Sequence, residues 1–227
     1  MLVQLGQALY DNSGSNYNSN GKTAVVTFTI GNNPNRLMWA FAARKDGAAR
    51  ATGISDGSAF TSLGVTDDAG IGHGLFSEIW YLGNPTTGSR TVTATWAAVG
   101  HCYLHVFSLY NVNQTTPVDG YLGQFLENNA TNTRLILSKL GGMACVGVLN
   151  YPGSETISEV GIQIARQTLN TDSKSSTRVG TAFTTVGYTF SAATADSIVS
   201  ACNVNGIPST GMNNNLRPAP FKPMAGG

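Results

Sequence analysis

Charge is scarce in this sequence. Asp, Glu, Lys and Arg make up 11% of its 227 residues, and the formal net charge is +1. Thr, Asn and Ser supply 64 residues between them, so the polar surface must be mostly uncharged. A nearly neutral chain has no electrostatic footprint for nucleic acid or for an anionic membrane. We therefore expect neither of these partners.

Long apolar runs are also missing. No stretch approaches the ~18 consecutive apolar residues that a membrane-spanning helix needs. The first residues, MLVQLGQALYDNSGSN, have neither the basic start nor the long apolar stretch of a secretory signal peptide. We expect a protein that is made in the cytoplasm of its host and is released by a route without a signal, such as lysis.

Cysteine is rare, and helix signals are almost absent. Cys102, Cys145 and Cys202 are widely spaced in apolar runs, which is typical of buried free thiols rather than of a disulfide framework or a zinc site. Apolar stripes at the helical spacing i, i+3, i+4, i+7 do not persist along the chain. The core must therefore be built from strands.

Strand signals recur throughout the chain. Apolar and polar residues alternate in 24–30, 91–96 and 160–165, as expected of strands with one buried face. Short strands at this spacing predict an all-β, antiparallel β-sandwich of jelly-roll-like form that occupies residues 1–205 as one domain. Further strands are expected at 36–44, 59–65, 75–82, 101–110, 133–139, 143–150, 176–190 and 196–204. The expected core includes Phe28, Trp39, Phe41, Val92, Trp96, Val106, Val146, Ile162 and Ile164.

Two segments lack strand patterns. Residues 11–21 (DNSGSNYNSNG) are predicted to form a polar loop. Residues 206–227 contain four of the eight prolines, which favour extended backbone. We expect these residues to form an extended C-terminal arm that binds a partner, with a loose chain end as the alternative. The arm residues expected to bind the partner are Leu216, Arg217, Phe221, Lys222 and Met224.

A weak internal echo links two apolar segments. RLMWAFAARKDG at 36–47 and GMACVGVLNYPG at 142–153 both give an apolar strand followed by a polar turn. We interpret this echo as pseudo-symmetry within one sandwich rather than as a duplication.

Chemistry-bearing motifs are missing. The sequence has no nucleophile elbow, no zinc-protease motif and no phosphate-binding loop, so we expect no enzymatic activity and no cofactor. His101 and His105 would lie on one face of a strand but ~13 Å apart, too far for one metal ion to bridge. We therefore expect no metal site.

Aromatic residues carry the remaining functional signal. Trp80 and Tyr81 would point to opposite faces of their strand, so one of the two rings is expected to be exposed or to lie at an interface. Exposed rings among Asn, Gln and Thr can stack on sugars. A glycan-binding adhesive or a receptor-binding fibre module is therefore the alternative function.

Two segments resemble a known module. Residues 80–96 (WYLGNPTTGSRTVTATW) and 108–119 (SLYNVNQTTPVD) are similar to a β-sandwich module of phage virion structural proteins and bacterial surface proteins. The Asn35-Arg36-Leu37 entry to the next apolar strand is also similar. The resemblance covers about half of the chain and implies a β-sandwich scaffold without catalytic residues.

A virion structural protein is the function that these observations favour. We expect a phage capsid decoration (cement) protein or another accessory head or tail component, located on the virion. Its partners would be the major capsid protein or other virion subunits. We also expect a homo-oligomer, with a trimer favoured because accessory virion proteins often lie on symmetry axes. Tyr81, Tyr103 and Tyr110 are the candidates for the shared patch.

Overall fold

The computed structural model describes residues 6–45, 49–68, 72–136, 141–153, 155–180, 184–191 and 196–207. Within these ranges the chain forms strands and contains no helix, and every strand pairing is antiparallel. The prediction of an all-β chain with antiparallel sheets is therefore confirmed. The strands are β1 (Leu9–Ile30), β2 (Leu37–Lys45), β3 (Ala51–Ser55), β4 (Thr61–Asp67), β5 (Phe76–Gly83), β6 (Gly88–Tyr110), β7 (Val118–Leu126), β8 (Thr131–Ile136), β9 (Met143–Tyr151), β10 (Ile157–Glu159), β11 (Ile164–Leu169), β12 (Ser173–Val179), β13 (Thr184–Phe190) and β14 (Asp196–Val204).

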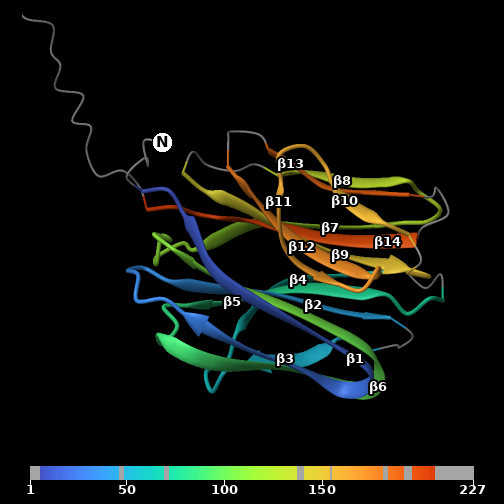
Figure 1. Ribbon diagram of the computed structural model, residues 1–227, viewed down its shortest axis with the longest axis horizontal. Helices are drawn as coiled ribbons and strands as arrows, with labels where there is room; N and C mark the ends of the chain where they lie inside the picture. Colours follow the sequence, from blue (N-terminus) through green and yellow to red (C-terminus); the bar gives the residue numbers. More distant parts are fainter. Residues whose placement is uncertain are drawn as a thin grey trace, which may run out of the picture.

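The strands form three sheets (Figure 1). The first sheet is folded and contributes two layers, so the three sheets stack as four layers. The first sheet has the order β1-β6-β2-β5-β4, with β3 also paired to β6. The second has the order β11-β12-β9-β14-β7, and the third has the order β10-β13-β8.

The first sheet is folded over on itself, because β1 and β6 both bend. Their pairing shifts register around Gly21 and Gly100. Beyond the bend, the second part of β1 lies over its first part. A Cβ at Gly14 would lie 2.6 Å from Val26 Cγ1, and the N–H of Gly31, just after β1, donates to Asp11 at 2.8 Å. One pair of long strands thus contributes to two layers.

The two halves of the chain share one strand order. In the N-half (β1–β6), the inner layer runs β1-β6-β2-β5-β4, which begins with the first strand of the half and continues with the last. The inner layer of the C-half (β7–β14) runs β7-β14-β9-β12-β11 in the same sense. The outer layers also match, with the order β1-β6-β3 in the N-half and β8-β13-β10 in the C-half. The region expected to be one sandwich is therefore built from two halves of equal topology.

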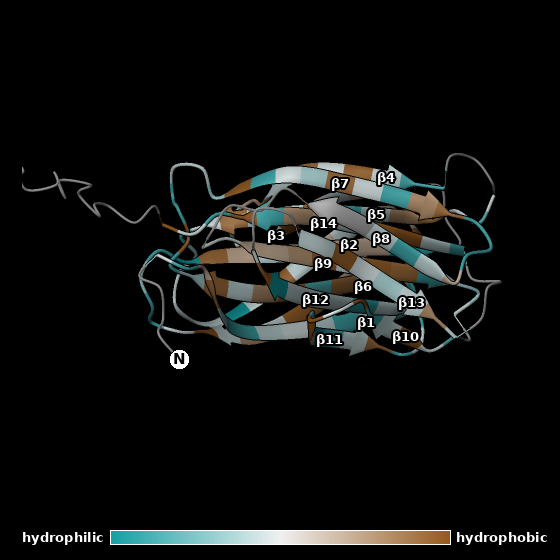
Figure 2. Cartoon of the chain, turned by 90° about the horizontal axis from the view of Figure 1, so that it is seen from above, coloured by the Kyte–Doolittle hydropathy of each residue, from teal (hydrophilic) through white to brown (hydrophobic). Residues whose placement is uncertain are grey.

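The inner layers of the two halves pack face to face. In Figure 2, the inner strands of the two halves lie in pairs: β7 with β4, β14 with β5, β9 with β2, β12 with β6 and β11 with β1. The two strands of each pair are in contact. For example, β4 faces β7, and their equivalents in the other half, β11 and β1, also face each other. The halves are therefore related by a pseudo-two-fold axis between β2 and β9. This is the isologous arrangement of a symmetric dimer, formed within one chain.

The echo between 36–47 and 142–153 marks this axis. Those segments contain β2 and β9, and the strand pairings make Phe41 equivalent to Gly147. The echo was interpreted as pseudo-symmetry within one sandwich, whereas the structure shows that it relates the central strands of the two halves.

Three apolar cores lie between the layers. The central core separates the inner layers and includes Trp39, Phe41, Phe107 and Ile198. The N-half core includes Val26, Val92 and Trp96, and the C-half core includes Val146, Val199 and Tyr188. Because β2 and β9 have a core on each face, nearly every residue in them is buried, which explains their continuous apolar sequences.

Most of the predicted core is correct, but two residues are wrong. Phe28, Trp39, Phe41, Val92, Trp96, Val106 and Val146 are buried. Ile162 and Ile164 are instead 75% and 54% exposed. A turn at Gly161, with φ of 68°, interrupts the expected strand. Gln163 points inwards instead, where it accepts from the Gly187 N–H at 2.6 Å and donates to Ser176 Oγ at 2.8 Å.

The polar loop predicted at 11–21 is also wrong, because these residues belong to β1. Two contacts to β11 hold them: Ser15 Oγ donates to Gln167 Oε1 at 2.8 Å, and Gln167 Nε2 donates to Ser13 Oγ at 2.6 Å. Polar residues can form this strand because the neighbouring layer supplies polar partners.

The three cysteines are buried free thiols, as predicted. Cys102 lies in the N-half core, while Cys145 and Cys202 lie in the central core. Burial raises the pKa of Cys202 to about 12, so its thiol stays protonated.

The 176–190 segment, predicted as one strand, contains the end of β12 and all of β13.

The pseudo-two-fold axis requires one large and one small residue. A Cβ at Gly147 would lie 2.3 Å from two ring atoms of Phe41. Gly147→Ala should therefore destabilise the protein by about 1–3 kcal/mol through overpacking. A lower midpoint in urea unfolding would show this effect, and Phe41→Leu in the same chain should recover part of it.

Gly53→Ala is the matched control for that measurement. Gly53 also lies in a strand, but a Cβ there would meet no atom within 4 Å. Its unfolding midpoint should stay the same or rise slightly. Equal midpoints for Gly147→Ala and Gly53→Ala would contradict the packing that we assign to the axis.

Candidate functional site

The three tyrosines predicted for a shared patch lie in different environments. Tyr103 is fully buried in the central core, so it cannot belong to a surface patch in this structure. Tyr81 is partly buried against the same core. Tyr110 is partly exposed at the end of β6. The structure does not bring the three together on one surface.

The predicted arm lies almost wholly outside the described residues. Leu216, Arg217, Phe221, Lys222 and Met224 all fall in 208–227. The structure does describe where that segment begins. Gly206 pairs with Val112, and the Ile207 N–H donates to the Asn111 carbonyl at 3.1 Å.

Both ends of the described chain meet at one end of the stack, which we call the exit end (residues 6–8, 110–112 and 206–207). The Ala8 N–H donates to the Gly141 carbonyl at 2.8 Å. A Cβ at Gly206 would lie 2.2 Å from the carbonyl oxygens of both Gly6 and Gly141. Glycine is required at residue 206 because the two backbone segments leave no room for a side chain.

Two equivalent turns clasp the halves together. The turn before β12, in the C-half, carries Asp172, whose Oδ2 lies 2.9 Å from Lys45 Nζ of the N-half. The equivalent turn before β5, in the N-half, carries His73, whose Nε2 lies 2.9 Å from Asp196 Oδ2 of the C-half. His73 also stacks on Tyr151, with ring centroids 4.6 Å apart. Sequence reasoning missed both clasps because their partners are more than a hundred residues apart in the chain.

The Asp172 clasp includes buried aromatic residues. Tyr103 donates its hydroxyl proton to Asp172 Oδ2 at 2.5 Å, and Tyr17 stacks on Tyr103 with centroids 4.8 Å apart. The Tyr17 hydroxyl is in turn 2.5 Å from His101 Nδ1. Burial and the neighbouring Asp172 carboxylate raise the pKa of Tyr103 far above its usual value, so it acts as a hydrogen-bond donor and not as a base.

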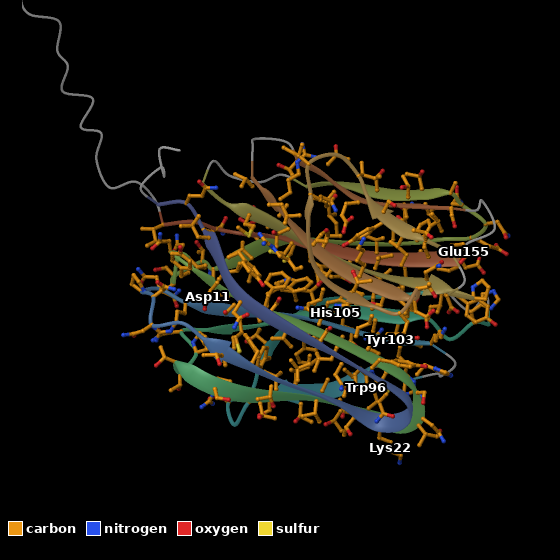
Figure 3. All side chains as sticks on the ribbon, in the orientation of Figure 1. Asp11, Lys22, Trp96, Tyr103, His105 and Glu155 are labelled. Atoms are coloured by element: carbon orange, nitrogen blue, oxygen red, sulfur yellow. The ribbon has the colours of Figure 1, made fainter. Side chains whose placement is uncertain are left out.

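His105 forms a second buried link between the halves. Figure 3 shows His105 beside Tyr103 in the interior. Its Nε2 lies 2.8 Å from Ser173 Oγ, and Ser173 donates its own proton to the Val148 carbonyl at 2.8 Å. Nε2 must therefore carry the imidazole proton. Ser77 and Ser200 occupy the pseudo-equivalent positions and bond across the interface at 2.7 Å.

In each half, an aspartate of the first strand accepts a hydrogen bond from a side chain of the last strand. Ser108 donates to Asp11 Oδ2 at 2.8 Å in the N-half. At the equivalent place in the C-half, Asn203 Nδ2 donates to Asp119 Oδ1 at 3.1 Å. This repeated contact supports the equivalence of the halves at the level of single residues.

Glu78 is a buried carboxylate in the N-half. Burial raises its pKa, although two donors stabilise the charge: the Ala51 N–H at 2.7 Å and Trp80 Nε1 at 3.2 Å. Trp80 is thereby fixed against the N-half core, while Tyr81 packs against the central core. Each ring is partly buried, as its face of β5 dictates.

Within the described ranges, no group of three or more His, Cys, Asp or Glu side chains is placed to hold a metal ion.

The outer face of the N-half is rich in hydroxyl groups, with exposed Thr27, Thr29, Ser89, Thr91 and Thr95 on β1 and β6. On β1 and β6, Thr27 and Thr91 lie opposite each other with their hydroxyls 2.9 Å apart. The exposed large hydrophobic residues of the described chain are aliphatic and not aromatic: Val25, Val99, Leu122, Ile162, Ile164 and Val179.

Comparisons with known proteins gave no match to a family model, to a curated protein or to a solved structure. The described part of the chain holds no helix that is long and apolar enough to cross a membrane.

His105 should make stability depend on pH. Complete burial lowers the pKa of its imidazole from 6.5 to about 3. Between these two values the unfolded chain binds a proton that the folded chain does not, so stability falls as the pH drops below about 6.5. At pH 4.5 this contribution amounts to about 2–3 kcal/mol relative to pH 7.5.

The variant His105→Gln isolates this contribution, because glutamine can still donate to Ser173 but does not titrate. Urea unfolding of both proteins at pH 7.5 and pH 4.5 gives the comparison. The wild type should lose more stability on acidification than the variant. An equal loss in both proteins would rule out His105 as the source.

Proposed function

We propose that this protein is a virion structural protein, a phage capsid decoration (cement) protein or another accessory head or tail component. The observation that carries the proposal is the exit end. The segment 208–227 begins there, beside the partly exposed Tyr110, while the four-layer body is closed by its own contacts. A rigid body with a chain end leaving from one point suits a protein that attaches to a neighbouring subunit.

The organisation of the body supports a scaffold role. The buried ionisable residues Lys45, Asp172 and His105 are engaged in contacts between the halves. The order of strands in each half supports a jelly-roll-like description, and jelly rolls are frequent in viral shells and lectins. The resemblance of 80–119 to virion and surface-protein modules points in the same direction.

The arm would bind as an extended segment. Pro218, Pro220 and Pro223 restrict φ, so the segment loses less conformational entropy on docking than a flexible chain does. Leu216, Phe221 and Met224 would supply the apolar contacts, and Arg217 and Lys222 would pair with an acidic partner surface. On the particle, the partners would be the major capsid protein or further copies of this chain, with a trimer favoured.

Truncation tests the proposal. A chain ending at Ile207 keeps the hydrogen bond of that residue to Asn111, so its melting temperature should match that of the full chain. It should nevertheless fail to co-sediment with the virus particles that the full chain decorates. Full occupancy of particles by the shortened chain would exclude the arm as the anchor.

Two point variants make the test specific. Phe221→Ser should weaken particle binding, whereas Val99→Ser removes an apolar side chain that is 55% exposed in the body and should leave binding unchanged. The alternative, a glycan-binding adhesive module, predicts that the isolated protein binds a glycan array and that the chain ending at Ile207 binds it equally well.

A further inference from the structure

One ion pair joins the two halves at a buried position. Lys45 Nζ, at the end of β2, lies 2.9 Å from Asp172 Oδ2, in the turn before β12. The two side chains are only 9% and 12% exposed, and the residues are 127 positions apart in the sequence. A lysine amine and a carboxyl group are thus held in contact with little access to water.

The surroundings of the pair concentrate hydrogen bonds on one carboxylate oxygen. Tyr103 donates its hydroxyl proton to Asp172 Oδ2, the oxygen that Lys45 also contacts. The Tyr17 ring covers Tyr103. On the other side, Gly153 packs so closely that a Cβ there would lie 1.7 Å from Asp172 Oδ1. The carboxyl group is enclosed, and both donors approach the oxygen that would have to leave in a condensation.

The geometry points to an intramolecular isopeptide bond between Lys45 Nζ and Asp172 Cγ. A proton first passes from the ammonium to Oδ2, which gives a neutral amine and a carboxylic acid. The nitrogen lone pair then attacks Cγ, the Cγ–Oδ2 bond breaks, and Oδ2 leaves as water with a second proton from the nitrogen. The sum is one ammonium and one carboxylate converted to one amide and one water, with no change in net charge and no further reactant.

Three features of the site favour this reaction. A buried ion pair has a large desolvation cost, which the neutral amine and acid avoid. Two groups held in contact react with effective concentrations of up to ~10⁵–10⁸ M in well-oriented intramolecular systems. The Tyr103 hydroxyl stabilises the departing oxygen by its hydrogen bond, and its raised pKa keeps the proton on that hydroxyl.

The bond would fasten the halves covalently. It would close a loop between residues 127 positions apart, from the central strand β2 of the N-half to the clasping turn of the C-half. The halves, which the chain between β6 and β7 already joins, would then have a second covalent link. This inference concerns the body of the protein and does not depend on the proposed role of the C-terminal arm.

The intact mass of the purified full-length protein tests the inference. The wild type should be lighter than its sequence by one water molecule, and a denaturing gel should show a more compact chain. Lys45→Arg keeps the positive charge but cannot form this amide, so the variant should show the full mass. A wild-type protein that stays at full mass after prolonged incubation overturns the proposal and leaves an ion pair.

Peptide mapping excludes other losses of water. Succinimide formation at Asp46-Gly47, Asp56-Gly57 or Asp119-Gly120 would also remove one water, but it would occur in Lys45→Arg as well. Lys174 and Glu159 are an internal control, because they form an ion pair at 3.0 Å within the C-half in which the lysine also donates to the Ile157 carbonyl. A cross-linked peptide that contains Lys45 and Asp172 supports the assignment. A mass loss that is equal in the wild type and in Lys45→Arg, or a link mapped to Lys174 and Glu159, refutes it.

Discussion

The packing of β2 against β9 is the contact on which the rest of the architecture depends. Both strands lie at the centre of a five-stranded layer, and both have a core on each face. At the axis Phe41 faces Gly147, and the ring fills the space that a side chain at residue 147 would occupy. The pseudo-symmetry of the molecule is broken where close packing requires it.

Polar contacts around this centre fix how the halves meet. The apolar core favours burial but specifies no single orientation, whereas His105 to Ser173 and Ser77 to Ser200 fix equivalent positions on either side of the axis. The turns that carry Asp172 and His73 then reach across from opposite halves to Lys45 and Asp196. A chain with only 11% charged residues thus places two ion pairs between its halves.

This use of charge bears on both proposals. The outer face of the N-half presents hydroxyl groups, and in the proposed role attachment to a partner would be made by residues 208–227, which follow Ile207 beside Asn111. The Lys45–Asp172 contact would go further and make the union of the halves permanent. If both proposals hold, a covalently fastened body and a separate attachment segment would be complementary properties of a particle component.

Local patterns in the sequence were enough to predict the all-β class, the buried thiols and most of the core, because period-2 alternation and continuous apolar runs reflect local burial. It predicted β2, β9 and β14 closely, since strands with a core on both faces have distinctive apolar composition. It failed at 11–21, where polar side chains form a strand that pairs with β6 and bonds to β11, and at Ile162 and Ile164, where the turn at Gly161 and the contacts of Gln163 set the register. The face-to-face packing of the halves, the clasps and the burial of Tyr103 could not be predicted in this way. Each depends on residues far apart in the chain, and no local pattern records which of them will meet.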